Sequence, residues 1–260
     1  MKRLVFLIAP LIIFSSSFSF AQGSGRNSAL SNKIFLPGKM GYTLFWQDDF
    51  NGDHLDSAKW SYRESSRRIG VFSKDALSVK DGVLHISAFM KNDTLHTGIV
   101  ETKGKFSTTY GYFECRAKMQ QSTGIWSAFW LQSPKISEGE DPAVFGAEVD
   151  IFEYFKQYGK DFTTHAIHYA YGPNMRSKGP ILSYKEGLDQ GYHVFGLEWT
   201  PEKYVFYVDG LKFHEETFGL SHIDEFIILS LEIPGNKREI ENIISPDGFL
   251  IDYVKVYKKR

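Results

Sequence analysis

The fold class of this chain is set by a series of short segments in which apolar and polar residues alternate between turn sequences. In residues 111–119, Phe113, Cys115, Ala117 and Met119 share one face of an extended chain, and polar residues occupy the other face. No segment shows the sustained 3.6-residue periodicity of an amphipathic helix. Many short strands joined by turns are typical of sandwiches and jelly rolls, so we predict an all-β fold of two antiparallel sheets.

Turn chemistry supports further strands in the second half of the chain. Residues 204–208 and 211–213 flank Asp209-Gly210, and an Asp-Gly pair between two apolar runs predicts a β-hairpin. Residues 226–231 form a nearly continuous apolar run, which suits a strand buried on both faces. The last predicted strand covers 250–257.

The N-terminus is typical of a signal peptide. Lys2 and Arg3 precede an apolar run over 4–14, which a Ser-rich stretch follows. The small residues Ser19 and Ala21 fit a cleavage site after Ala21. The apolar run is shorter than the about 20 residues that a membrane span needs. We therefore predict a signal peptide over 1–21, a secreted protein (periplasmic or extracellular), and no membrane attachment after cleavage.

The remaining chain divides into a short segment and one domain. Residues 22–40 are rich in Ser, Gly and Asn and lack periodicity, so we predict a flexible segment there and a single domain over 41–260. Cys115 is the one cysteine of the 260 residues, so no intramolecular disulfide forms and the fold rests on its core. Cys115 itself is expected to be a small buried side chain.

The charge balance argues against two classes of partner. With 30 basic and 31 acidic residues the formal net charge is -1, which gives no field to attract nucleic acid or an anionic membrane. A neutral partner suits this balance, and we expect a monomer. Aromatic residues make up 16% of the chain, which fits an aromatic-rich β core.

One segment, EVDIFE at 148–153, carries three acids in a strand pattern. In a regular strand Glu148 and Asp150 share one face, whereas Glu153 points to the other. A bulge of one residue at 151–152 returns Glu153 to the face of the first two acids. We predict this bulge and a cluster of three carboxylates.

Three neighbouring carboxylates suit acid–base chemistry. Like charges raise one pKa and leave another group ionised. Glycoside hydrolysis with retention uses such a pair, an ionised nucleophile and a protonated acid about 5–5.5 Å apart. The residues alone leave a second interpretation open, namely an ordinary solvated strand face that carries acids.

Motifs throughout residues 42–258 resemble glycoside hydrolase family 16, the family of laminarinases, lichenases, agarases and carrageenases. The matching segments are FWQDDFNG (45–52), TKGKF (102–106), YGYFECRAK (110–118), GIWSAFWL (124–131), EVDIFE (148–153), LEWTP (197–201), YVDG (207–210) and DYVKVY (252–257).

This resemblance implies a concanavalin A-like β-jelly roll with a concave carbohydrate cleft, and a family 16 catalytic domain over 41–260. It implies Glu148 as nucleophile, Glu153 as acid/base and Asp150 as a residue that tunes the nucleophile, with no cofactor required. The extra residue Phe152 places the chain in the bulged branch, with laminarinases, agarases and carrageenases.

Trp126 and Trp130 lie two strand repeats apart and share one face. The residues alone favour core indoles, but the resemblance implies that both bind sugar rings in the cleft. It gives His168 a cleft position also, whereas we expect His165 to be structural. The loop over 171–176 lies where it can reach the acceptor side of the cleft.

An acidic run near residues 48–56 suggests either a solvated loop or a cation site, and the loop is the simpler interpretation. Some family members hold a structural calcium partly through an Asp that matches Asp252. We therefore predict no metal in the catalytic site and leave a structural calcium open.

The predicted function is endo-acting, retaining hydrolysis of a polysaccharide, with β-1,3- or mixed-linkage β-glucan preferred. Ile99 stands where many laminarinases carry Arg, and Ser127 where they carry Pro, so a β-galactan hydrolase of agarase, porphyranase or carrageenase type is the first alternative. The others are transglycosylation and a non-catalytic carbohydrate-binding protein, which would not need three acids.

Overall fold

The computed structural model describes residues 29–31, 33–241 and 243–260. Its helical turns are η1 (Pro37–Met40), η2 (Lys74–Ala76), α1 (Pro142–Phe145), η3 (Lys156–Tyr158) and η4 (Lys237–Ile240). Its strands are β1 (Tyr42–Asp48), β2 (Ser61–Tyr62), β3 (Ser65–Arg67), β4 (Gly70–Phe72), β5 (Leu77–Lys80), β6 (Val83–Lys91), β7 (Thr94–Thr97), β8 (Ile99–Glu101), β9 (Gly111–Lys118), β10 (Trp126–Gln132), β11 (Glu148–Tyr154), β12 (Phe162–Tyr169), β13 (Arg176–Tyr184), β14 (His193–Trp199), β15 (Tyr204–Val208), β16 (Leu211–Glu216), β17 (Phe226–Glu232) and β18 (Asp247–Lys259).

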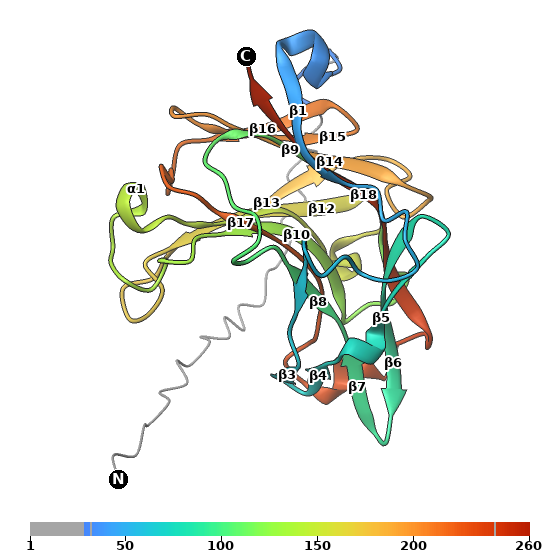
Figure 1. Ribbon diagram of the computed structural model, residues 1–260. Coiled ribbons are helices and arrows are strands. Elements are labelled where there is room, and N and C mark those ends of the chain that lie inside the picture. The colour runs from blue at the N-terminus through green and yellow to red at the C-terminus, as the bar shows by residue number, and fades with distance from the viewer. Residues whose placement is uncertain (1–28, 32, 242) are drawn as a thin grey trace.

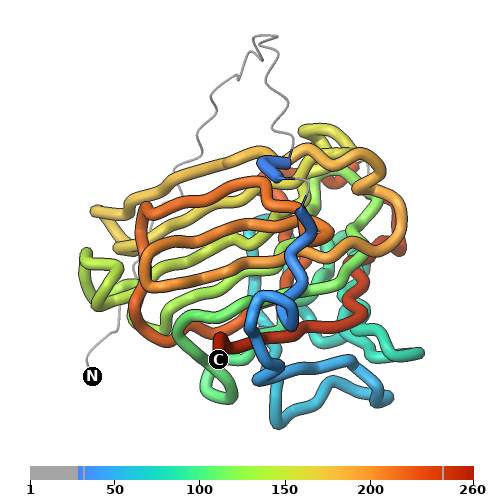
Figure 2. Tube along the Cα trace, turned by 90° about the horizontal axis from the view of Figure 1, so that it is seen from above, coloured from blue at the N-terminus to red at the C-terminus, as the bar shows by residue number. Residues whose placement is uncertain are grey.

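The described strands form two stacked sheets, as Figure 1 shows. One has eleven strands in the order β16-β15-β14-β9-β18-β6-β7-β4-β3, with β1 added beside β18 and β5 beside β6. The other has seven strands in the order β13-β12-β11-β10-β17-β8-β2. Neighbouring strands are antiparallel except β4 and β7. Figure 2 shows from above that β14, β15 and β16 (orange) lie side by side. The predicted all-β jelly-roll sandwich is confirmed.

The core lies between the two sheets and is rich in aromatic rings. Phe152 of the seven-stranded sheet stacks on Phe195 of the other sheet, with ring centroids 3.8 Å apart. Every residue of β17 is buried, which confirms the prediction of a strand covered on both faces. Cys115 is 0% exposed, as expected. Burial of apolar area between the sheets is the main stabilising term in a fold without disulfides.

The predicted hairpin at Asp209-Gly210 joins β15 to β16. Both turn residues have positive φ angles, 49° for Asp209 and 73° for Gly210. This backbone matches the right-handed twist of paired strands, and only small or turn-forming residues adopt it readily. Local sequence therefore determines this connection.

The described part of the segment over 22–40, which is predicted to be flexible, contacts the hairpin of β15 and β16. The backbone N–H of Leu30 donates to the carbonyl of Lys212 at 2.7 Å, and that of Phe35 donates to Gly210 at 2.8 Å. The Phe35 ring stacks on Tyr112 at 4.6 Å on the outer face of the larger sheet. An aromatic patch distant in sequence thus buries Phe35, whereas its neighbours Ile34 and Leu36 are exposed. Residues 22–28 and the predicted signal peptide lie outside the described residues.

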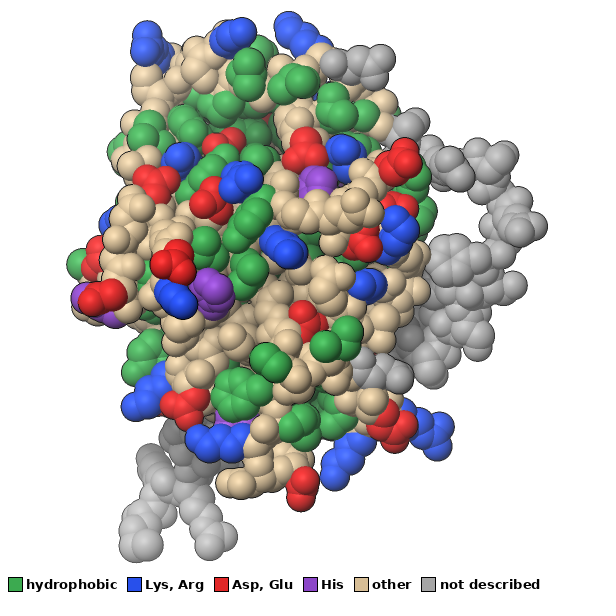
Figure 3. Space-filling model, turned by 90° about the vertical axis from the view of Figure 1, so that its right-hand side faces the viewer, with side chains coloured by type: hydrophobic (Ala, Val, Ile, Leu, Met, Phe, Trp, Pro, Cys, Tyr) green, Lys and Arg blue, Asp and Glu red, His purple; other side chains and the backbone are tan. Residues whose placement is uncertain are grey.

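The surface in Figure 3 carries acidic and basic side chains side by side over one flank of the sandwich. This interspersion agrees with the near-zero net charge. Across the described ranges, no helix has the length and apolar character needed to cross a bilayer.

Candidate active site

The predicted bulge lies in the middle of β11. On the side of β10, Trp130 pairs with Asp150 and Phe129 pairs with Phe152, so Ile151 is an extra residue in the ladder. On the side of β12 the register shifts over the same stretch. Ile151 and Phe152 are both 0% exposed, which shows that the bulge turns two consecutive apolar side chains toward the core.

The register places the three acids on one face. Glu148, Asp150 and Glu153 pair with residues of β10 that are spaced by two: Gln132, Trp130 and Ala128. β10 itself pairs regularly with β17, so its alternate residues share a face. The indole N–H of Trp126, on that same face, donates to Oε1 of Glu153 at 3.0 Å. The structure therefore brings together the three acids that the sequence predicted, on the face turned away from the other sheet.

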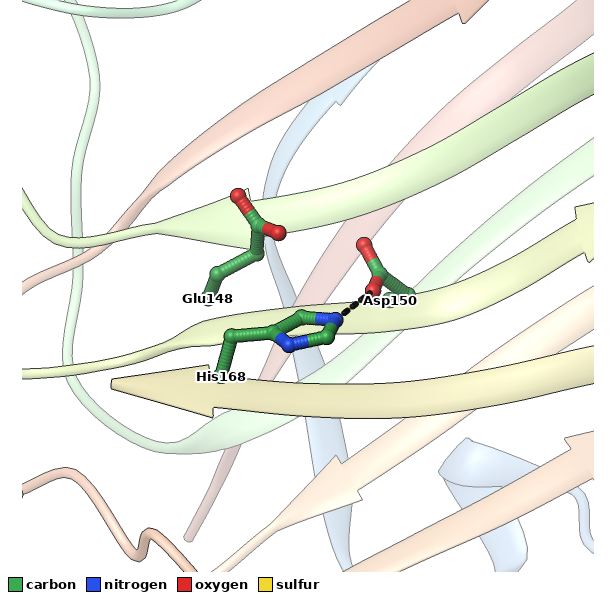
Figure 4. Close-up of side chains that lie close together, drawn as sticks. All are labelled: Glu148, Asp150 and His168. Carbon is green, nitrogen blue, oxygen red and sulfur yellow. Dashed lines mark ion pairs between the residues drawn. The ribbon is translucent and has the colours of Figure 1, made fainter. Parts of the chain in front are cut away.

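His168 on β12 completes this acidic cluster, as Figure 4 shows. Its Nε2 lies 3.3 Å from Oδ2 of Asp150, and its Nδ1 lies 2.7 Å from the hydroxyl of Ser177. One atom each from Glu148, Asp150 and His168 fall within 4.8 Å of one another. Burial lowers the pKa of His168, but the hydrogen bond to Asp150 and its charge outweigh this effect and raise the pKa to about 9. A cationic imidazole thus offsets part of the clustered negative charge at neutral pH.

Two donors hold the side chain of Glu148. Nε2 of Gln132 donates to Oε2 of Glu148 at 3.0 Å, and the hydroxyl of Tyr171 donates to the same oxygen. Tyr171 belongs to the loop between β12 and β13, and its backbone N–H is fixed to the carbonyl of Ile136 at 3.0 Å. Both donors favour the ionised form of Glu148.

The pKa values of the two glutamates lie above those of ordinary carboxylates because both side chains are shielded from solvent. Burial first, and the charge of Asp150 second, raise the pKa of Glu148 to about 7. The same two causes raise the pKa of Glu153 well above its usual value, with Glu148 adding to the repulsion. Glu153 has one neutral donor, Trp126, whereas Glu148 has two. This environment suits a protonated Glu153 beside an ionisable Glu148.

The two tryptophans lie on the acid face, but their surroundings differ. The ring of Phe155 stacks on Trp126 at 4.8 Å from the β11 side. The guanidinium of Arg68, which hydrogen-bonds Glu232 at the β17 side, lies 4.8 Å over the same indole. Contacts with a phenyl ring and a guanidinium thus hold Trp126, whose N–H donates to Glu153. Trp130 is partly exposed and donates from Nε1 to the hydroxyl of Ser230 at 3.1 Å.

Sequence reasoning missed Gln132, Tyr171 and Arg68. Gln132 had a usable signal, because it lies two residues after Trp130 on a regular strand and so shares its face. The loop of Tyr171 was placed near the cleft, but nothing in its composition indicated a contact with Glu148. Arg68 comes from the turn between β3 and β4 and carried no local signal.

His165 lies in the core, away from the three acids. It is 0% exposed, its Nδ1 lies 2.6 Å from the carbonyl oxygen of Ile151, and its Nε2 lies 2.8 Å from the hydroxyl of Ser183. A second buried group supports the other end of β11: Oε1 of Glu225 accepts the backbone N–H of Ala147 at 2.9 Å. Burial raises the pKa of Glu225 to about 8.

Two of the acids considered for a structural calcium, Asp252 and Asp48, have protein partners. Asp252 accepts a hydrogen bond from Arg116 at 2.6 Å. In the acidic run, Asp48 accepts from the indole of Trp60 at 2.8 Å and from the backbone N–H of Phe50 at 3.0 Å. A cavity of about 360 Å³ adjoins this run, away from the three acids. These contacts give Asp252 and Asp48 protein partners, and calcium enters no step below.

A jelly-roll sandwich that carries clustered carboxylates and indoles on one open sheet defines a carbohydrate-active β-sandwich domain. Comparison with known families makes this specific. The family model described as "Beta-porphyranase A-D, GH16 domain" matches residues 46–258, and the chain belongs to glycoside hydrolase family 16.

The chain is also similar to individual family members. It is 28% identical to glucan endo-1,3-beta-glucosidase A1 of Niallia circulans, over 86% of this chain and 39% of that protein. It is 29% identical to keratan-sulfate endo-1,4-beta-galactosidase of Sphingobacterium multivorum, over 84% of this chain and 55% of that protein. The chain thus spans about half the length of these curated relatives. The crystal structure of a laminarinase from Flavobacterium sp. UMI-01 matches with a TM-score of 0.68 and 25% identity, over 83% of this chain and all of that one.

Proposed function

We propose that this chain is a retaining, endo-acting β-glycosidase in which Glu148 is the nucleophile and Glu153 the general acid/base. The observation that carries this proposal is the bulge at Ile151, because it brings Glu153 to the face of Glu148 and Asp150. The raised pKa of Glu153 supports its role as the proton donor, and the two donors on Glu148 support its role as an anion.

The reaction follows from these roles. Glu153 gives its proton to the glycosidic oxygen while a carboxylate oxygen of Glu148 attacks the anomeric carbon, so the glycosidic bond breaks as an ester bond forms. Glu153, now ionised, takes a proton from water, and the hydroxide adds to the anomeric carbon as the ester bond to Glu148 breaks. The enzyme returns to its starting protonation, and two inversions retain the configuration. Asp150, paired with His168, keeps negative charge beside both glutamates.

The substrate we propose first is β-1,3- or mixed-linkage β-glucan, which the similarity to a glucan endo-1,3-beta-glucosidase and to a laminarinase supports. A specific observation favours β-galactan as the second candidate: the matching family model is that of porphyranases, and one relative is a keratan-sulfate galactosidase. Ile99, in place of the Arg of many laminarinases, is buried and offers no hydrogen-bond donor to a hydroxyl.

The test is release of reducing ends from laminarin, mixed-linkage glucan, agarose, porphyran and carrageenan, with product sizing to establish the endo mode. Proton NMR of the first products is expected to show the β anomer. Glu148→Gln and Glu153→Gln are each expected to lower kcat by at least about 10³-fold with an unchanged circular dichroism spectrum. Full activity of either variant would refute the assigned roles, and binding of a polysaccharide without any release would support the lectin alternative.

Two further proposals concern the export of the protein and its oligomeric state. We propose export through the predicted signal peptide over 1–21, supported by its basic start and apolar run. Sequencing of the mature N-terminus from an exporting host tests this, and Gln22 is the expected first residue. We also propose a monomer that acts on polysaccharide, and light scattering of the purified protein tests the oligomeric state.

A further inference from the structure

The bulge of β11 interrupts the backbone ladder, and side chains of β12 take over its hydrogen bonds. The carbonyl of Ile151 meets Nδ1 of His165 at 2.6 Å. The carbonyl of Glu153 accepts from the hydroxyls of Thr163 and Thr164 at 3.0 and 3.2 Å. A buried carbonyl without a partner is costly, so these contacts determine whether the bulge is stable at this position.

The contacts of His165 define its protonation state. A carbonyl oxygen can only accept, so Nδ1 carries the hydrogen, and Nε2 accepts from the hydroxyl of Ser183 at 2.8 Å. Burial lowers the pKa of His165 to about 4, which keeps the ring neutral at neutral pH. His165 is therefore a fixed donor on the core side of β12, while His168, three residues later, is on the acid side.

We propose that His165 is a positioning residue for Glu153: by fixing the carbonyl of Ile151 it fixes the bulge, and with it the side of the sheet on which Glu153 lies. This inference rests on the proposed function, in which Glu153 donates the proton. A shift of one residue in a strand reverses the direction of every following side chain, so a loosened bulge displaces Glu153 while Glu148, before the bulge, stays in place.

The test compares variants that keep or remove the donor. The amide of His165→Asn reaches the position of Nδ1 and keeps a donor for Ile151, whereas His165→Leu removes it. Ser183→Ala removes the partner that fixes the tautomer and serves if His165→Leu does not fold. The probes are phenyl and 2,4-dinitrophenyl β-glycosides of laminaribiose, or of the disaccharide of whichever polysaccharide the wild type cleaves.

Acid catalysis matters for the phenyl leaving group and little for dinitrophenolate, so the two probes separate Glu153 from Glu148. For His165→Leu, kcat/KM is expected to fall about 10- to 100-fold on the phenyl glycoside and less than about threefold on the dinitrophenyl glycoside. His165→Asn is expected to keep most of the wild-type kcat/KM on the phenyl glycoside. Ser183→Ala is expected to show a smaller loss than His165→Leu, again mainly on the phenyl glycoside. Equal losses on both probes, or no rescue by Asn, would overturn the proposal.

Two controls keep this result separate from instability and from a wrong function. Ile86→Ala, in β6 of the other sheet, removes a fully buried side chain and is expected to lower stability without changing the ratio of the two rates. Amide hydrogen exchange over β11 needs no substrate: exchange at residues 151–153 is expected to speed up in His165→Leu and not in His165→Asn. If the wild type cleaves nothing, the proposed function fails, and unchanged exchange in His165→Leu would separately refute the support of the bulge.

Discussion

The hydroxyl of Tyr171 donates a hydrogen bond to Oε2 of Glu148. The two residues are 23 positions apart, with Glu148 on β11 and Tyr171 in the loop between β12 and β13. This contact and the one from Gln132 give the proposed nucleophile two neutral hydrogen-bond donors. The charge of His168 and these two hydrogen bonds favour the charged form of Glu148, in a partly buried place where each has a large effect on its pKa.

Tyr171→Phe tests this dependence. Loss of the donor is expected to raise the pKa of Glu148, because its anion loses a stabilising hydrogen bond. A hydrogen bond to a charged group is worth about 1.5–3 kcal/mol, so kcat/KM at pH 7 is expected to fall about 10- to 100-fold. The measurement is the pH dependence of kcat/KM, whose acidic limb is expected to move to higher pH. An unmoved acidic limb would contradict the role of Tyr171.

The wild-type pH profile is expected to be a bell. Below the pKa of Glu148, about 7, protonation removes the nucleophile, so kcat/KM falls as pH decreases through this value. Above the raised pKa of Glu153, loss of its proton removes the acid, and kcat/KM falls again. We therefore expect an optimum on the alkaline side of neutrality, measured with a soluble oligosaccharide over pH 5–10. A plateau that extends to pH 5 would show that Glu148 ionises in the ordinary range.

His168→Gln tests the cation in the acidic cluster. The charge of His168 lowers the pKa of both Glu148 and Glu153, so its loss is expected to move both limbs of the profile to higher pH. A loss of kcat/KM of about tenfold at pH 7 follows from the smaller fraction of ionised Glu148. His85→Gln, in the other sheet, is the matched control and should leave both limbs in place. A shift of one limb alone would contradict the prediction that the charge of His168 acts on both carboxylates.

Trp126→Phe and Trp130→Phe are expected to differ in kind. The hydrogen bond from Trp126 lowers the pKa of Glu153. Trp126→Phe removes this bond and raises that pKa, so the alkaline limb should move to higher pH. The second removes a donor to Ser230 and leaves Glu153 untouched. Its expected effect is a higher KM of about tenfold, if Trp130 carries a sugar ring, with the limbs unchanged. The same pH response in both variants would contradict separate roles.

Glu225→Gln addresses stability rather than catalysis. Burial raises the pKa of Glu225 to about 8 from an ordinary value of 4.5. Its protonated form is favoured in the fold, so this contribution is fully present below pH 4.5 and is lost as pH rises through 8. One pKa unit corresponds to about 1.4 kcal/mol, and the neutral amide should raise the free energy of unfolding at pH 8 by at least that amount. Urea unfolding at pH 5 and 8 measures this, and an equal change at both pH values would contradict it.

The sequence alone predicted several of the strands, the faces of β10 and β11, the hairpin at Asp209-Gly210 and the bulge of the acid motif. These features depend on the two-residue period of a strand and on local dihedral preferences. Both are set by residues close together in the sequence. Family resemblance then assigned roles to Glu148 and Glu153 before any coordinates.

Only the tertiary structure decided what surrounds these acids. Tyr171, Arg68 and His165 reach β10 and β11 from other strands or loops, and the packing of Phe35 depends on rings far along the chain. Periodicity carries no information about which loop meets which strand, because that choice follows from sheet order and loop closure. The electrostatics of the site follow in turn, since burial and the contacts made across strands shift the pKa of each acid.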